Sequence, residues 1–115
     1  MTNADAPTRL FIYGTLAPGR ANHYVVHDLG GTWQAANLRG DLVDEGWGAG
    51  MGYPAIVPRE DGPSVEGFVL SAPALAAHWP RLDAFEGEGY ERVVVTVTLD
   101  TGERVDAQVY ALRKR

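Results

Sequence analysis

Cysteine is absent from this chain of 115 residues. Without cysteine the protein has no disulfide, no thiolate metal site and no cysteine nucleophile. No apolar run approaches the roughly 18 residues that a membrane-spanning helix requires. Basic residues are fewer than acidic ones: 10 Lys and Arg against 15 Asp and Glu give a formal net charge of −5. This balance disfavours nucleic acid and an anionic membrane surface as partners.

Several motifs of nucleotide, metal and serine enzymes are missing as well. The run from Gly46 to Gly52 fits neither Gly-x-Gly-x-x-Gly nor a phosphate-binding loop, which ends in Lys followed by Ser or Thr. His23, His27 and His78 stand outside an HExxH motif and have no third ligand at a suitable spacing. The only two serines lie outside any Gly-x-Ser-x-Gly motif. We therefore expect no cofactor, no metal and no serine nucleophile.

Length and composition are typical of one globular domain. The chain has the size of an ordinary domain, and its 45% hydrophobic content is enough for a core. We expect a single domain over residues 1–115. Residues 1–8 are small and polar, without the apolar segment of a signal peptide, so they predict a flexible lead-in and a cytoplasmic protein. Whether the protein is a monomer or a homodimer stays open.

Hydrophobic patterns predict six or seven strands and one principal helix. The helix is expected to begin near Pro73 and to stop at residues 87–89, which contain two glycines. Residues 32–44 form either two short strands or one strand bent at Gly40. Residues 46–52 are expected to be a loop, either a mobile rim over a pocket or a plain connection. The other predicted strands are residues 9–13, 53–57, 64–70, 92–99 and 105–111.

One helix cannot cover both faces of an open sheet, and this limits the architecture. Closing the sheet into a barrel removes its edges. It also leaves a mouth where loops from distant segments can meet. The expected fold class is therefore α+β, a small mixed β-barrel with one principal helix packed against it.

Glu86 is the strongest candidate for a catalytic side chain. Leu75, Trp79 and Leu82 are spaced at i, i+4 and i+7, so they share one face of the predicted helix. At about 100° per residue Glu86 falls within roughly 20° of Leu75, inside this apolar stripe. A carboxylate there needs hydrogen-bond donors or a raised pKa, and a raised pKa is typical of a general acid/base. The alternative is that Pro80 shifts the register and leaves Glu86 on the surface.

The segment from Tyr13 to Leu16 is a candidate anion-binding turn. It directly follows a predicted buried strand, and Gly14 permits backbone angles at which successive N–H groups converge on an anion. Thr15 adds a hydroxyl group. The alternative is an ordinary turn between a strand and a loop.

Together these elements resemble the gamma-glutamylcyclotransferase-like family. The resemblance covers residues 9–111, and its most specific motifs are Tyr-Gly-Thr-Leu and Leu-Asp-Ala-Phe-Glu-Gly, in this order. The supporting segments are residues 11–16, 44–55, 65–67, 82–87, 90–92 and 109–110.

The resemblance implies a small mixed barrel with a pocket at one end. It implies an enzyme that releases 5-oxoproline from gamma-glutamyl compounds, without a cofactor, with Glu86 as the catalytic residue. The short chain is similar to the compact branch of the family, which includes enzymes acting on gamma-glutamylamine linkages to lysine side chains. The backbone of residues 13–16 would hold the alpha-carboxylate of the substrate. The implied substrate-binding residues are Tyr13, Gly14, Thr15, Leu16, Tyr53, Pro54 and Tyr90.

Two alternatives from other classes remain. A barrel of the same shape could bind a small acidic metabolite without turnover. Such a binder has no need of a costly carboxylate in an apolar stripe, so Glu86 favours the enzyme. An oligonucleotide-binding barrel is disfavoured by the acidic balance of the chain.

Overall fold

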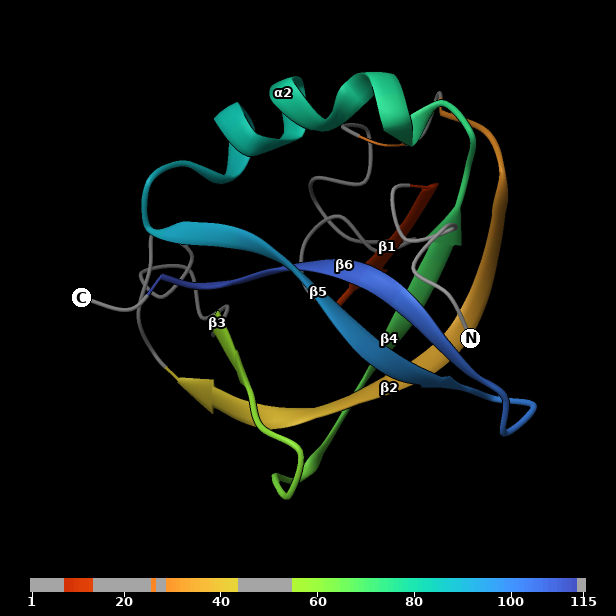
Figure 1. The fold of residues 1–115 in the computed structure, drawn as a ribbon, viewed down its shortest axis with the longest axis vertical. Helices are drawn as coiled ribbons and strands as arrows, with labels where there is room; N and C mark the ends of the chain where they lie inside the picture. The colour runs from red at the N-terminus through yellow and green to blue at the C-terminus, as the bar shows by residue number, and fades with distance from the viewer. Residues whose placement is uncertain (1–7, 14–25, 27–28, 44–54, 114–115) are drawn as a thin grey trace.

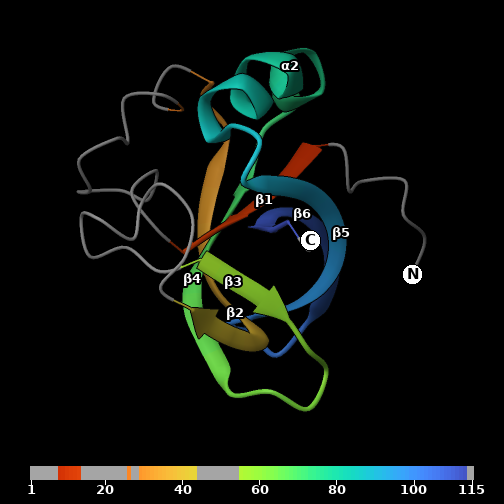
Figure 2. The ribbon, with the colours of Figure 1, turned by 90° about the vertical axis from the view of Figure 1, so that its left-hand side faces the viewer.

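The computed structural model of the chain describes residues 8–13, 26, 29–43 and 55–113. This part contains a six-stranded sheet in the order β1-β4-β2-β3-β6-β5, with additional pairing of β1 with β6 and of β2 with β5. The helix α2 lies over one side of the curved sheet, at the top of Figures 1 and 2. The elements are β1 (Arg9–Ile12), β2 (Thr32–Val43), β3 (Ala55–Pro58), β4 (Ser64–Ser71), α2 (Leu75–Glu86), β5 (Tyr90–Leu99) and β6 (Arg104–Leu112).

The additional pairings close the sheet into a barrel. Leu10 of β1 pairs with Leu70 of antiparallel β4 on one side and with Gln108 of parallel β6 on the other. On the opposite side of the barrel, Ala36 of β2 pairs with Leu99 of β5. The ring β1-β4-β2-β5-β6 is therefore closed, and β3 is added beside β2 and β6. The mixed β-barrel with one principal helix predicted from the sequence is confirmed.

The strand β2 is one continuous strand of 12 residues, and its neighbours change at Gly40. Up to Arg39 it pairs with β4, and from Gly40 onward it pairs with β3. A Cβ atom at Gly40 would lie 2.6 Å from the carbonyl oxygen of Val57, so only glycine fits this close approach of two backbones. Of the two forms left open by the sequence, the single strand is the one observed.

Alternation along the strands builds two hydrophobic layers. Phe11, Val97 and Val109 belong to the cluster that fills the barrel. Leu10 and Tyr110 belong to a second cluster, which also includes side chains of α2. Both faces of β6 are consequently buried, because the face opposite the barrel interior is covered by this second cluster.

The helix α2 buries the predicted stripe. Leu75, Trp79 and Leu82 are its buried residues, with exposed fractions of 0%, 6% and 1%. Pro80 lies inside the helix and is exposed, and the stripe continues past it to Leu82 without a change of register. The helix ends at Gly87, which has φ +84° and donates its N–H to the carbonyl oxygen of Asp83 at 3.0 Å. No helix in the described ranges has the length and apolar character needed to cross a membrane.

Candidate functional site

Glu86 is the last residue of α2, and its side chain is partly buried. Burial disfavours the charged form of a carboxyl group, and it raises the pKa of Glu86 from an ordinary value near 4.5 to about 7. The buried stripe of the helix thus ends at Leu82, and Glu86 follows it in a partly buried position. A carboxyl group with a pKa near neutrality can both accept and donate a proton at physiological pH.

Two tyrosines, Tyr13 directly after β1 and Tyr110 of β6, lie close enough to Glu86 to interact with its charge. Burial is the main reason that the pKa of the Tyr13 phenol is raised, and the Glu86 carboxylate raises it further. The pKa of the Tyr110 phenol is raised by burial and by its hydrogen bond to Asp83, with a smaller contribution from Glu86. The end of β1, strand β6 and the end of α2 thus meet at one place.

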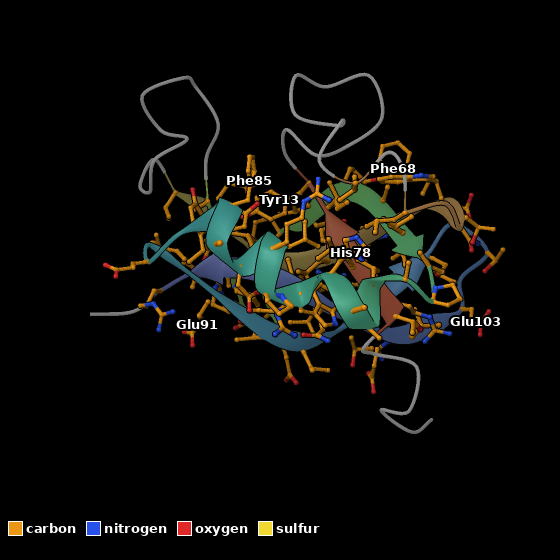
Figure 3. All side chains as sticks on the ribbon, turned by 90° about the horizontal axis from the view of Figure 1, so that it is seen from above. Tyr13, Phe68, His78, Phe85, Glu91 and Glu103 are labelled. Atoms are coloured by element: carbon orange, nitrogen blue, oxygen red, sulfur yellow. The ribbon has the colours of Figure 1, made fainter. Side chains whose placement is uncertain are left out.

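The hydroxyl group of Tyr13 connects three elements. It donates a hydrogen bond to the carbonyl oxygen of Tyr110 at 3.0 Å and accepts one from the N–H of Ile56 at 3.0 Å. Its ring stacks on Phe11, with 6.3 Å between ring centroids, and packs against the cluster inside the barrel. Figure 3 shows Tyr13 and Phe85 on the same side of the C-terminal turn of α2. The phenol of Tyr13 therefore holds β1, β3 and β6 together.

Most residues of the two predicted loop segments lie outside the described part of the chain. These residues are Gly14, Thr15, Leu16, Tyr53 and Pro54. Their immediate neighbours are described: Tyr13 precedes Gly14, and Ala55 follows Pro54. Because the Tyr13 hydroxyl is hydrogen-bonded to the residue after Ala55, both segments join the described structure at adjacent points.

Tyr90, the remaining predicted substrate-binding residue, is the first residue of β5 and is 7% exposed. It belongs to the same cluster as Tyr110 and Trp79, and its charged form would raise the pKa of Tyr13. Of the predicted site residues that are described, the structure therefore brings Glu86, Tyr13 and Tyr90 together.

Sequence reasoning missed a polar network beside Glu86. Asp83 accepts hydrogen bonds from the Tyr110 hydroxyl at 2.6 Å and from Arg92 Nε at 2.9 Å, both at Oδ1. Arg92 Nη2 donates to Asp83 Oδ2 at 3.2 Å, and Nη1 donates to Gln108 Oε1. The Arg92 guanidinium also lies over the Trp79 ring, 4.5 Å from its centroid. Hydrogen bonds from Arg92 are the main reason that the pKa of Asp83 is lowered.

Two sequence signals could have suggested this network. Asp83 stands three residues before Glu86, on the adjacent face of the same helix, where i and i+3 side chains are neighbours. Tyr110 occupies a strand position that faces away from the barrel interior, and a tyrosine there needs a partner for its hydroxyl once a helix covers it. Within the described residues, no group of three or more His, Asp or Glu side chains is arranged to hold a metal ion.

Solved structures similar to this chain come from animals, bacteria and plants. An AIG2-like protein, GGACT, from Mus musculus is 25% identical with a TM-score of 0.70, and the match covers 94% of this chain and 78% of that one. YkqA from Bacillus subtilis is 29% identical with a TM-score of 0.70 over 92% of this chain. A protein from Arabidopsis thaliana is 28% identical with a TM-score of 0.63, covering 90% of this chain and 67% of that one.

The chain spans only 36% of the length of YkqA. No curated protein sequence matches it. The sequence profile of the family described as gamma-glutamyl cyclotransferase, AIG2-like, matches residues 10–115, nearly the whole chain. The chain therefore belongs to the AIG2-like gamma-glutamyl cyclotransferase family, whose function is of the cyclotransferase type.

Proposed function

We propose that this protein releases 5-oxoproline from a gamma-glutamyl compound. The alpha-amine nitrogen of the gamma-glutamyl group attacks its own gamma-carbonyl carbon, and a five-membered ring closes. The bond from that carbon to the nitrogen of the acyl acceptor then breaks, and the acceptor leaves as a free amine. Because nucleophile and electrophile belong to one molecule, the protein mainly has to orient them.

Glu86 is the proposed general acid/base, and its raised pKa is the observation that carries the proposal. Its carboxylate form takes a proton from the attacking amine, and its carboxylic acid form gives that proton to the leaving nitrogen. A pKa of about 7 keeps both forms populated at neutral pH. The proton is returned within one cycle, so the reaction needs neither water nor an added acid.

The substrate is proposed to bind through the segment that begins at Tyr13. Backbone N–H groups of residues 13–16 would hold its alpha-carboxylate, and Tyr53, Pro54 and Tyr90 would line the site. The hydrogen bond between Tyr13 and the N–H of Ile56 supports this arrangement, because it brings the attachment points of both loop segments to the same place. Tyr90 and Tyr110 supply ring surface beside Glu86.

The proposal is tested by incubating the protein with a panel of gamma-glutamyl compounds and measuring 5-oxoproline. The panel contains gamma-glutamyl-ε-lysine, other gamma-glutamyl amines and gamma-glutamyl dipeptides. Matched alpha-glutamyl compounds serve as controls, because their gamma-carboxyl group is a free carboxylate and carries no amine that ring closure could release. We expect 5-oxoproline from at least one gamma-glutamyl compound and from no alpha-glutamyl control. Saturable binding without 5-oxoproline would contradict the enzyme and support a non-catalytic barrel that binds a small acidic metabolite.

A further inference from the structure

A polar network next to Glu86 takes no part in the proton transfer described above. It consists of Asp83 and Arg92, with Tyr110, Gln108 and Trp79 as their contacts. Its ion pair is partly exposed: the Arg92 side chain is 28% exposed and that of Asp83 is 44% exposed. An ion pair of this kind adds little stability by itself, about 0–1 kcal/mol. Stabilisation by this ion pair alone therefore does not explain why the Asp83–Arg92 network lies next to Glu86.

Hydrogen bonds connect Asp83 to three other parts of the described structure. Asp83 of α2 accepts the hydroxyl of Tyr110 from β6. The carbonyl oxygen of Tyr110 accepts the hydroxyl of Tyr13 from the end of β1. The same Tyr13 oxygen accepts the N–H of Ile56 from β3. These hydrogen bonds thus join the last turn of α2 to β6, and β6 through Tyr13 to β3.

Arg92 provides a second, independent attachment of the helix. Its guanidinium contacts Trp79 and Asp83, which lie one turn apart on α2. The guanidinium also donates a hydrogen bond to Gln108 on β6, so a residue of the barrel helps to orient it. A planar guanidinium held on an aromatic ring and by two nitrogens on one carboxylate has little freedom to rotate.

The charge of Asp83 is opposed by that of Arg92 in this arrangement. The described groups that interact with the charge of Glu86 include the phenols of Tyr13 and Tyr110, whose raised pKa values keep them neutral at pH 7. Asp83 stands three positions before Glu86 on α2, where side chains are neighbours, and its charge is paired with that of Arg92. A negative and a positive charge joined at 2.9 Å offset each other in part at a neighbouring group, so each alone would act on it more strongly than the pair. This agrees with burial being the cause of the raised pKa of Glu86.

We propose that Asp83 and Arg92 are positioning residues: they seat Tyr110 and the last turn of α2 so that the Glu86 carboxyl stays in its partly buried site, and each cancels the charge of the other there. The catalytic part of this inference rests on the proposed function. The electrostatic part can be tested without any substrate.

The first experiment measures the pKa of the Glu86 carboxyl by NMR titration in four proteins. These are the wild type, Asp83→Asn, Arg92→Gln and the double variant. Asp83→Asn leaves Arg92 unopposed, so the pKa of Glu86 should fall. Arg92→Gln leaves Asp83 unopposed, so it should rise. Each shift should be about half to one unit, given the partial exposure of the pair, and the double variant should return close to the wild type.

The matched control is another ion pair of the same kind. Arg59 Nε and Asp41 Oδ2 lie 2.9 Å apart, with side chains 47% and 41% exposed. Asp41→Asn should leave the pKa of Glu86 unchanged. Equal and small shifts in Asp41→Asn, Asp83→Asn and Arg92→Gln would overturn the electrostatic part of the inference.

The second experiment separates positioning from charge by means of Arg92→Lys and Tyr110→Phe. Lysine keeps the charge but cannot reproduce the two parallel hydrogen bonds of arginine, and phenylalanine removes only the hydroxyl that Asp83 accepts. Both variants should keep the pKa of Glu86 near its wild-type value. In both, kcat for 5-oxoproline release should fall about tenfold or more, with a smaller change in KM, because a small misplacement of a catalytic group is costly.

The outcomes distinguish the two proposals. Unchanged kcat in folded Arg92→Lys and Tyr110→Phe proteins would overturn the positioning role. If the wild type releases no 5-oxoproline from any substrate, the proposed function fails, while the titration of Glu86 in the four proteins still decides the electrostatic part. Thermal unfolding shows whether each variant is folded. Should Asp83→Asn unfold, the titration of Glu86 in Arg92→Gln against the wild type decides the electrostatic part.

Discussion

Glu86 combines a partly buried carboxyl group with a position at the end of a helix. Burial raises its pKa to about 7, so at neutral pH the folded protein holds a charge that water would solvate better. The Glu86 carboxylate is therefore less favourable here than in water, and it lies where the proposed reaction transfers a proton. Function and stability are therefore opposed at this residue.

Glu86→Gln should reduce turnover by at least about 10²-fold, because general acid–base catalysis typically contributes about 10²–10⁴-fold. The amide keeps the volume of the side chain but cannot exchange the proton. Binding of a gamma-glutamyl compound should survive, since the proposed carboxylate anchor is the segment from Tyr13 to Leu16. The rate of 5-oxoproline release and the dissociation constant are measured side by side. Full activity of this variant on a verified substrate would refute the assignment.

The same substitution should change how stability depends on pH. The pKa of Glu86 in the folded state, about 7, lies above its ordinary value near 4.5. The stabilisation from the protonated carboxyl is therefore fully present below about pH 4.5 and is lost as pH rises through 7. Urea unfolding should find Glu86→Gln more stable than the wild type at about pH 8, by up to about 3 kcal/mol, and the difference should shrink toward pH 5. An equal difference at both pH values would show that the carboxyl is not perturbed.

At the scale of elements, α2 is held by its apolar stripe and by one polar network. Trp79 takes part in both, because it is buried in the cluster between helix and barrel and its ring carries the Arg92 guanidinium. The described contacts that hold the C-terminal turn of α2 against the barrel therefore include those of Leu82 and Trp79, one and two turns before Glu86.

Trp79→Ala should lower the free energy of unfolding by about 3–5 kcal/mol, the usual cost of truncating a buried aromatic side chain. The matched control is Leu42→Ala on β2, since Leu42 is 47% exposed and should cost less than about 1 kcal/mol. Denaturant titrations of both variants give the comparison. A similar small loss in both would mean that the helix stripe does not carry the packing described above.

The strand pair β1–β4 depends on a glycine. A Cβ atom at Gly67 would lie 2.4 Å from the carbonyl oxygen of Ile12 and 2.8 Å from the Phe11 ring. Gly67→Ala should therefore cost about 1–3 kcal/mol and should displace the residue before Tyr13. Gly89→Ala is the control, because nothing lies within 4 Å of its added Cβ. Equal unfolding free energies for the two variants would contradict the close approach of β1 and β4.

At the scale of the whole molecule, the closed barrel brings together residues that are far apart in the chain. Tyr13 and Tyr110 are separated by 97 positions, and Tyr13 and Ile56 by 43, yet one hydroxyl group contacts both partners. A ligand held at this junction would contact several strands at once. Its binding would therefore stabilise the barrel as a whole.

A gamma-glutamyl ligand should accordingly raise the melting temperature of the protein. At 100 times its dissociation constant it would add about 2.7 kcal/mol to the free energy of unfolding. The increase should persist in Glu86→Gln and disappear in Gly14→Val, where a side chain would fill the space in which backbone and ligand are expected to meet. Thermal unfolding with and without ligand tests all three proteins. Equal stabilisation of a folded Gly14→Val protein would count against this binding segment.

Local periodic patterns were sufficient to predict the elements. The stripe of Leu75, Trp79 and Leu82 depends on helical spacing alone, so its burial followed from the sequence, and Glu86 is partly buried beyond it. The alternation in residues 92–99 and 105–111 predicted the hairpin that the structure forms as β5 and β6. The single helix, which cannot cover both faces of an open sheet, indicated a closed barrel.

Only the tertiary structure decided the contacts between distant segments. Whether residues 32–43 form one strand or two depended on β3 and β4 taking successive pairings along it, which no local pattern specifies. The burial of Tyr110 and Gln108 depended on the cluster that includes α2 and covers the second face of β6. Asp83 lies on the exposed face of α2. It became part of the polar network because Arg92 of β5 and Tyr110 of β6 donate hydrogen bonds to it. Hydrogen bonds between such groups arise from the closed topology, whereas hydrophobic periodicity is a property of each segment alone.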